Sequence, residues 1–437
     1  MRPSRQRAFR ASLLHLRDDP GNELNSSAVQ YFPDGILLVC DGYVQQVGAA
    51  ADVLATLPED CDLLHYPHHL LVPGFVDTHI HYPQTDMIAA YGEQLLEWLQ
   101  TYTFPTEKQF ADSEHAREVA EFFLDELLSN GTTTALVFGT VHPESVDAFF
   151  EAAAARQLRM IAGKVMMDRH CPNDLRDTPE SAYQDSKVLI EKWHGRGRLA
   201  YAVTPRFAPT SSPEQLAKAQ QLLAEFPDVY LHTHLAENQA EVDWVQALFP
   251  ERRSYLDVYQ HYGLLKPRSV LAHAIYLDDT DRHLMAEQGA AVAFCPCSNL
   301  FIGSGLFDWH KTKMAGVRVG MGTDVGGGDR FSLFQVANNA YKVTQLLGHQ
   351  LSAWQALYLL TLGGAKALYL DDKIGNFEQG KEADFVVLDL QATPLLKRRL
   401  HKVRDIHDLV FALLMLADDR AVAATYTLGE QAVFKTR

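Results

Sequence analysis

Eight short apolar segments alternate with helix-length stretches between residues 71 and 322, and this alternation constrains the fold more than any other feature. Amphipathic stretches such as Ala116–Ser129 and Pro213–Glu225 separate the segments. Parallel strands need long crossover connections, which are usually helices, so the pattern predicts a parallel sheet. Eight repeats close a (β/α)8 TIM-like barrel, which we expect over residues 71–375. The predicted strands are Leu71–Thr78, Thr132–Phe138, Met160–Met167, Ala200–Pro205, Val229–Thr233, Val270–His273, Ala290–Cys295 and Val317–Gly322.

The two ends of the chain, residues 1–70 and 376–437, have strand-like runs without intervening helix-length stretches. Asp41-Gly42 stands between two such runs and is a strong hairpin signal. Near the other end, Gly380–Asp389 reads as a turn into a strand, and Ala421–Phe434 reads as a closing hairpin. We therefore expect both ends to form one small flanking β-sandwich domain that the barrel divides.

The charge and cysteine content limit the possible partners and compartments. The 437 residues carry 55 acidic and 39 basic side chains, a net charge of −16, and an acidic surface repels phosphate backbones. We therefore expect no nucleic-acid partner. No apolar run is long enough to span a membrane, so no membrane association is expected. Five cysteines without a framework spacing indicate a reducing compartment, and a cytoplasmic location is the expectation.

Unusual polar residues stand at the ends of four predicted strands. His79 and His81 end the first strand, and side chains two residues apart share one face of a strand. His234 ends the fifth strand, His273 the sixth, and Asp324 follows the eighth. In such a barrel the carboxyl ends of all strands meet at the face where active sites lie. These side chains should therefore come together.

Each of these residues also has an ordinary structural interpretation. The first histidine pair could lie on a solvated strand end, His273 could be a core histidine, and Asp324 could cap a helix. All of these together would be a coincidence. Three imidazoles and one carboxylate suit zinc, with iron or manganese possible.

Glu237 follows His234 by three residues, where a loop or helix begins. A glutamate there can lean over a bound metal and move protons without being a ligand. The alternative is a first-turn glutamate that is favourable to the helix dipole.

This ordered set of residues resembles the amidohydrolase superfamily, whose members are metal-dependent hydrolases and deaminases on a (β/α)8 barrel with a flanking β domain. The resemblance extends to Pro73–Asp77 and Gly380–Asp384. Binuclear members use a lysine at the end of strand four, but Thr204–Pro209 contains none. The resemblance therefore implies one metal ion and the deaminase branch.

By that resemblance, one zinc ion is held by His79, His81, His234 and Asp324. His273 stands beside it and orients the attacking oxygen or stabilises developing charge. Asp324 would help to take the proton of water, and Glu237 would protonate a ring nitrogen and then the departing amine.

Three residues near these strand ends describe a pocket for a planar, hydrogen-bonding ring. Gln84 offers an amide donor and acceptor, Arg206 offers N–H donors, and Phe207 offers an apolar face. Their ordinary roles would be a turn residue, a salt-bridge partner and a core residue. Several segments are similar to the guanine-deaminating members of the superfamily: Phe75–Gln84, Tyr91–Leu99, Asn130–Thr134, Thr204–Thr210, Gly303–Phe307 and Gly320–Asp324.

The resemblance implies hydrolysis of guanine to xanthine and ammonia in purine catabolism or salvage. It implies that Gln84, Arg206, Phe207, His273 and Asp324 contact the base, and that the protein is a homodimer. The alternatives are deamination of another purine, a pterin or an aminotriazine. A non-catalytic scaffold would have lost a ligand or Glu237, and none is lost. A different zinc-deaminase fold uses His-x-Glu and Pro-Cys-x-x-Cys, which this chain lacks.

Overall fold

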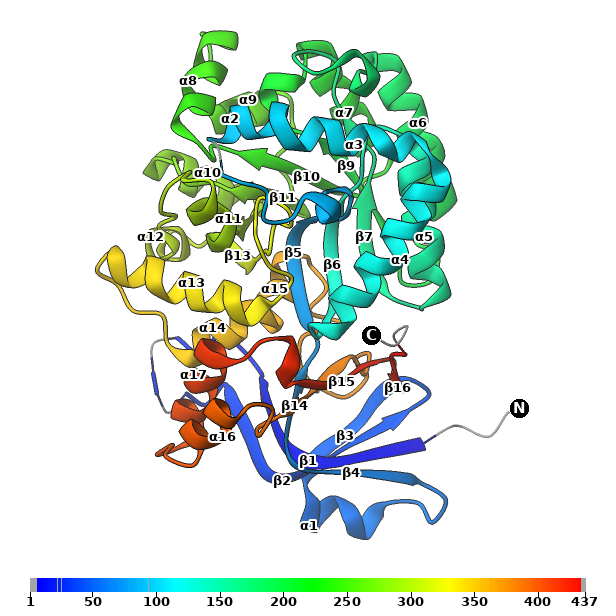
Figure 1. The fold of residues 1–437 in the computed structure, drawn as a ribbon, viewed down its shortest axis with the longest axis vertical. Helices are drawn as coiled ribbons and strands as arrows, with labels where there is room; N and C mark the ends of the chain where they lie inside the picture. Colours follow the sequence, from blue (N-terminus) through cyan, green and yellow to red (C-terminus); the bar gives the residue numbers. More distant parts are fainter. Residues whose placement is uncertain (1–5, 22, 25, 93, 434–437) are drawn as a thin grey trace.

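A computed structural model describes residues 6–433 except 22, 25 and 93. A barrel surrounded by helices occupies the upper part of Figure 1, and a mixed sheet lies below it. No helix in the described part of the chain is both long and apolar enough to cross a membrane.

The predicted (β/α)8 barrel is confirmed. Its parallel sheet has the order β13-β12-β11-β10-β9-β7-β6-β5, with the short β8 pairing beside β9. The ends of the sheet are joined by the Thr78 hydroxyl, which donates to the Met321 carbonyl oxygen at 3.0 Å, and by the Asp324 N–H, which donates to the His79 carbonyl oxygen at 2.9 Å. The strands are β5 (Phe75–His81), β6 (Thr132–Phe138), β7 (Arg159–Gly163), β8 (Val165–Met166), β9 (Ala200–Pro205), β10 (Tyr230–Leu235), β11 (Ser269–His273), β12 (Ala291–Phe294) and β13 (Arg318–Met321).

The helices form where capping residues precede amphipathic stretches. For example, Ser212 accepts the Gln215 N–H before Pro213 starts α7, and the Leu216 and Leu222 side chains of that helix are buried. The helices around the barrel are α4 (Ser113–Ser129), α5 (Pro143–Ala155), α6 (Pro179–Trp193), α7 (Pro213–Glu225), α8 (Gln239–Leu248), α9 (Tyr255–His261), α10 (Asp279–Gln288), α11 (Pro296–Phe301), α12 (Trp309–Met314), α13 (Leu333–Leu346), α14 (Ala353–Leu360) and α15 (Leu362–Ala367). Two short helices, α2 (Leu95–Trp98) and α3 (Phe104–Glu107), lie in the connection between β5 and α4.

The flanking domain draws strands from both ends of the chain, in the order β16-β15-β14-β4-β1-β2-β3. In the described residues, the strands of the expected sandwich belong to a single sheet. This sheet curls, because its β3 end returns to the segment before β14. There the Val44 N–H donates to the Lys381 carbonyl oxygen at 2.8 Å. The strands are β1 (Gln6–Leu16), β2 (Val29–Cys40), β3 (Tyr43–Ala49), β4 (Asp62–Pro73), β14 (Phe385–Asp389), β15 (Val422–Thr427) and β16 (Glu430–Gln431).

The hairpin at Asp41-Gly42 is confirmed, with φ values of 51° and 89° at these two residues, as a tight β-turn of this kind requires. The closing hairpin is β15 and β16, and the predicted end of its second strand at Phe434 lies outside the described residues. Helix α1 (Ala50–Val53) follows β3.

Two features of the flanking domain differ from the sequence expectation. Helices α16 (Pro394–Leu400) and α17 (Ile406–Leu416) lie between β14 and β15, and α17 contributes Val410 and Leu413 to the main core. The predicted first barrel strand, Leu71–Thr78, is divided between β4 and β5. Gly74 forms the corner, where an added Cβ would lie 2.1 Å from the Thr133 hydroxyl oxygen. The domain limits at residues 70/71 and 375/376 stay a prediction.

Buried ion pairs join the barrel to the flanking domain. Arg159 of β7 donates from Nε to the Glu382 carboxylate at 2.7 Å, and Arg198 donates to the same carboxylate at 3.0 Å. Arg198 also pairs with Asp384. Glu382 and Asp384 belong to the Gly380–Asp384 motif, so that motif holds the two domains together.

His15 on β1 gives the flanking domain a predicted acid sensitivity. Its side chain is 1% exposed, and burial lowers its pKa to about 4. Above pH 6.5 the imidazole is neutral in both the folded and the unfolded chain. As the pH falls from 6.5 to 4, only the unfolded chain takes up the proton, so this residue should cost about 3 kcal/mol of stability over that interval. His15→Leu should flatten this part of the stability profile in denaturant titrations. His65→Leu, at an exposed position on β4, should not; equal profiles for both variants would contradict the prediction.

Candidate active site

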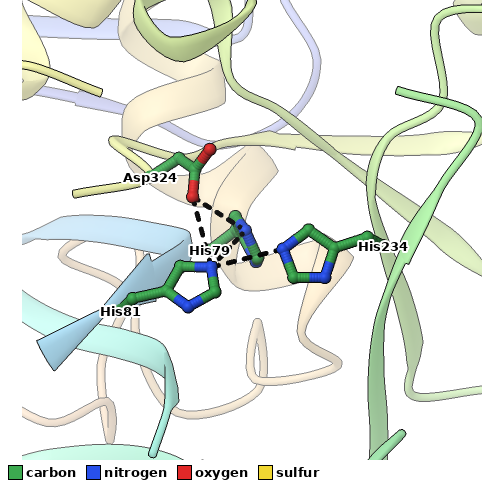
Figure 2. A group of neighbouring side chains, drawn as sticks. All are labelled: His79, His81, His234 and Asp324. Atoms are coloured by element: carbon green, nitrogen blue, oxygen red, sulfur yellow. Dashed lines mark hydrogen bonds and ion pairs between the residues drawn. The ribbon is translucent and has the colours of Figure 1, made fainter. Parts of the chain in front are cut away.

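Four side chains with metal-binding atoms converge at the carboxyl ends of the barrel strands. His79 and His81 come from β5, His234 from β10 and Asp324 from the loop after β13, and their ligand atoms lie within 4.8 Å of one another. In Figure 2 the three rings and the carboxylate point toward a common centre. Asp324 Oδ1 lies 3.1 Å from His79 Nε2 and 3.3 Å from His81 Nε2. The structure thus brings together all four predicted ligands.

The donor set fits a metal ion. His81 Nε2 lies 3.3 Å from both His79 Nε2 and His234 Nε2. Two ligands of a tetrahedral zinc ion with bonds of about 2.0–2.1 Å are themselves about 3.3–3.4 Å apart. Burial lowers the pKa of all three imidazoles, so they are neutral, the form in which histidine binds metals. Neutral nitrogens that converge at these distances can share one cation.

The other ring nitrogen of each of these histidines has a protein partner. His81 Nδ1 lies 3.1 Å from Gln84 Nε2. His234 Nδ1 donates to the Arg206 carbonyl oxygen at 2.8 Å, which leaves Nε2 facing the cluster. His79 Nδ1 lies 2.7 Å from His232 Nε2. His232 therefore supports the candidate ligand His79. Because side chains alternate along β10, His232 faces the inside of the barrel, as His234 does.

The backbone at the site adopts conformations that side chains rarely allow. His273 at the end of β11 and Asp324 in the loop after β13 both lie at positive φ, 70° and 52°. Such left-handed residues cost energy and persist where the surrounding structure requires them, often at functional sites. Asp77 of β5 helps to hold this region, because its carboxylate accepts the N–H groups of His79 (3.1 Å) and Thr323 (3.2 Å).

Glu237 and His273 form the second part of the site. Glu237 Oε2 lies 3.4 Å from His273 Nε2, and His273 Nε2 lies 3.7 Å from Asp324 Oδ2. Glu237 is 3% exposed and precedes the first residue of α8 instead of lying in its first turn. Burial, reinforced by the negative charge of Asp324, raises the pKa of Glu237 well above its usual range. A carboxyl group in this environment can hold a proton near neutral pH.

Several residues that support this pair were missed from the sequence. The Asn299 side-chain oxygen accepts from His273 Nδ1 at 2.8 Å, so His273 Nε2 faces the site. The Ser304 hydroxyl donates to Glu237 Oε1 at 3.3 Å, and the Glu237 N–H donates to Glu241 at 2.9 Å. Ser304 lies in the Gly303–Phe307 segment that carries the family resemblance. Glu241 could have been recognised as the third residue of a helix with a capping asparagine.

The predicted ring-binding residues line one cavity with the cluster. Its wall includes Gln84, Arg206 and Phe207 together with His81, Glu237 and Asp324. Leu95, Trp98 and Ile302 add apolar surface to the same wall. Flat apolar walls with a few convergent polar groups are typical of a site for a small planar ligand. Glu107, which contacts Arg206 and Gln84 here, was also missed from the sequence.

The structure places Lys164 away from the cluster. Its side chain is fully buried between β7 and β8 and pairs with Asp177 at 2.6 Å. Among the described residues, only one group of at least three side chains could hold a metal. All five cysteines are free. These observations support the expectation of a single metal ion, which stays a prediction.

Known proteins resemble this chain over nearly its whole length. The model of the Amidohydrolase family matches residues 70–431. The chain is 54% identical to the guanine deaminase of Escherichia coli (strain K12) over 404 residues, which is 92% of each protein. A solved structure of E. coli guanine deaminase superposes with a TM-score of 0.96 and 52% identity, covering 98% of this chain and all of that one. The C. acetobutylicum guanine deaminase with guanine bound in its active site superposes with a TM-score of 0.87 and 25% identity, covering 98% and 100%.

Proposed function

This chain belongs to the amidohydrolase family, and from this premise we propose that it catalyses the hydrolytic deamination of guanine to xanthine and ammonia. One observation carries the proposal on the structural side. A buried His-His-His-Asp cluster and a proton-holding glutamate share one cavity with a glutamine, an arginine and a phenylalanine. Such a cavity combines hydrolytic chemistry with recognition of a flat, hydrogen-bonding base.

The family is metal-dependent, and we propose one zinc ion per chain, held by His79, His81, His234 and Asp324. Three neutral imidazoles and one carboxylate are a ligand set suited to zinc. When bound, the ion supplies a nucleophile at neutral pH by lowering the pKa of water from 15.7 to about 7.

The side chains around this site carry out the proton transfers. Asp324 accepts a proton from the attacking water, and His273 orients the oxygen of that water through Nε2. Glu237 donates its proton to the ring nitrogen beside the amino-bearing carbon, then takes up the proton of the new hydroxyl group on that carbon and passes it to the departing amine. One C–O bond forms, one C–N bond breaks, ammonia leaves with one added proton, and the proton held by Asp324 restores the acid form of Glu237. The short separations among Glu237, His273 and Asp324 support these roles.

The base is held from its edge and from its face. Arg206 and Gln84 supply hydrogen bonds to the edge, and Phe207 supplies apolar surface beside the ring. His273 and Asp324 contact the substrate where the reaction occurs. The placement of all five residues on one cavity or beside its cluster supports this arrangement.

An ultraviolet assay on metal-quantified protein tests the proposed function. Guanine, adenine, cytosine and a pterin are supplied separately, and ammonia release is measured in parallel. We expect turnover of guanine at least about 100-fold faster than of the other compounds, because a site built for one hydrogen-bonding pattern leaves polar groups unpaired with another. Preference for a pterin or another purine would replace the substrate assignment, and no turnover of any compound would overturn the activity itself.

Arg206→Ala should lower kcat/KM for guanine by about 100-fold, mainly by raising KM. A buried hydrogen bond from a charged group contributes about 1.5–3 kcal/mol, and Arg206 is 2% exposed. Steady-state kinetics check this. Arg156→Ala is a matched control, because Arg156 pairs with Asp125 outside the cavity. Equal kinetics for wild type and Arg206→Ala would remove Arg206 from the pocket.

We also propose that the enzyme is a cytoplasmic homodimer that works in guanine catabolism or salvage. The five free cysteines support a reducing compartment, and the family resemblance supports the dimer. Sedimentation analysis of the purified protein tests the dimer, and a monomer at micromolar concentration would contradict it.

A further inference from the structure

Glu107 is a buried carboxylate beside the base-binding residues to which the reaction gives no role. It is the last residue of α3, in the connection that crosses the upper part of the barrel in Figure 1. Its side chain is 1% exposed, and a buried carboxylate persists only where it is paired.

Its partners are the two residues that are proposed to hold the edge of the base. Arg206 donates from Nη1 to Glu107 Oε1 at 3.0 Å and to Oε2 at 2.8 Å. Gln84 donates from Nε2 to Glu107 Oε1 at 3.0 Å. The Arg206 guanidinium also lies 5.6 Å from the centre of the Phe104 ring, on the same short helix. Glu107 thus holds both side chains from behind the cavity.

This contact determines which Arg206 atoms remain for a ligand. The hydrogen bonds of the guanidinium to described residues leave from Nη1. The Nε–H and one Nη2–H lie on a different edge of the planar group and form a pair of parallel donors. Such a pair matches two neighbouring acceptors, as presented by the carbonyl oxygen O6 and the imidazole-ring nitrogen N7 of guanine.

The same contact fixes the polarity of the Gln84 amide. The amide nitrogen donates to Glu107 and also lies 3.1 Å from His81 Nδ1, and the amide oxygen points the other way, where it accepts the Gly326 N–H at 3.2 Å. That oxygen has a second lone pair, which can accept a hydrogen bond from a base in the cavity that Gln84 lines. The negative charge of Glu107 also balances the positive charge of Arg206. This charge balance suits a site for an uncharged base.

We propose that Glu107 is a positioning residue that sets the donor and acceptor pattern of the pocket and thereby selects a 6-oxo over a 6-amino purine. The proposal rests on the proposed function. With Glu107 in place, an amino group at the position of the guanine oxygen would direct its hydrogens at the Arg206 donors. Without it, Arg206 and Gln84 can reorient, and this discrimination should weaken.

The test compares guanine with 2,6-diaminopurine, in which an amino group replaces the guanine oxygen and the neighbouring ring nitrogen N1 carries no hydrogen. In Glu107→Gln, KM for guanine should rise about 30-fold with kcat within about 3-fold of wild type, in line with the loss of one charged hydrogen bond. The ratio of kcat/KM for guanine to that for 2,6-diaminopurine should fall about 10-fold. Glu107→Asp, which keeps the charge, should show smaller changes in the same direction. If the glutamine variant does not fold, the same constants are measured on Glu107→Asp.

Two further variants separate positioning from a structural role. Glu382→Gln also alters a buried carboxylate bound by arginines, but it lies at the joint between the domains. It should lower thermal stability and leave KM and the purine ratio unchanged. In an Arg206→Ala background, Glu107→Gln should change kcat/KM by less than about 3-fold, because the group that it positions is absent.

The outcomes are distinct from those of the functional assay. Wild-type protein that does not deaminate guanine would overturn the proposed function. Wild-type turnover of guanine with an unchanged purine ratio in both Glu107 variants would overturn only the role of Glu107. Equal loss of kcat/KM for both purines, with lowered kcat or metal content, would show that Glu107 is structural.

Discussion

Replacing Glu237 by glutamine is expected to lower kcat for guanine by about 10³-fold while the bound metal is retained. Glutamine has nearly the same shape and can still accept the Ser304 hydrogen bond, but it cannot deliver a proton. General acid–base catalysis contributes typically about 10²–10⁴-fold, and here one group serves two successive transfers. Glu237 is absent from the converging ligand cluster, so metal content should not change. Single-turnover kinetics and metal analysis on one preparation measure both quantities.

The control for this variant is Glu214→Gln. Glu214 lies in the first turn of α7, at the mouth of the preceding barrel unit, and is exposed. If Glu237 acted only on a helix dipole, both variants would lose a few tenths of a kcal/mol of stability and neither would lose turnover. Near-normal turnover of Glu237→Gln would assign the proton transfer to another group.

Removal of the metal is expected to lower kcat by about 10³-fold or more and to lower Tm. In the apoprotein, His81 Nε2 would stay 3.3 Å from the Nε2 atoms of His79 and His234 with no shared cation, beside the Asp324 carboxylate. Binding energy at a site that the unfolded chain lacks adds to the stability of the fold. Dialysis against a chelator, followed by calorimetry and assay, measures both losses.

Titration of the apoprotein with zinc then tests the number of ions. Activity should reach its maximum at one equivalent per chain, because Lys164 is paired with Asp177 and strand four ends without a lysine. His234→Ala should reduce zinc retention. His310→Ala should not, since His310 stacks on His349 outside the cluster. A requirement for two equivalents would contradict the mononuclear site.

The barrel and the ligand positions could be predicted because their signals are local. Alternation along β5 places His79 and His81 on one face, and the carboxyl-end rule brings His234 and Asp324 to them from distant strands. The corner at Gly74 was missed although Pro73-Gly74 interrupts Leu71–Thr78, because the apolar residues on both sides of that dipeptide were assigned to one strand. Helix α17 was missed because its apolar residues, such as Leu413, were not distinguished from a strand-rich terminal segment.

The sequence by itself determined the strand order and which side chains reach the mouth of the barrel. The two-residue period of a strand fixes which face each side chain takes, and helical connections between parallel strands bring all their carboxyl ends to one side of the barrel. Only the tertiary structure decided how those side chains are held. Glu107 and Arg206 are 99 positions apart, and Asn299 reaches His273 from helix α11, which follows the next barrel strand. Pairing of buried polar groups depends on where loops fold back over the mouth. No periodicity encodes it, since any donor and acceptor brought within about 3 Å in a dry site stabilise each other.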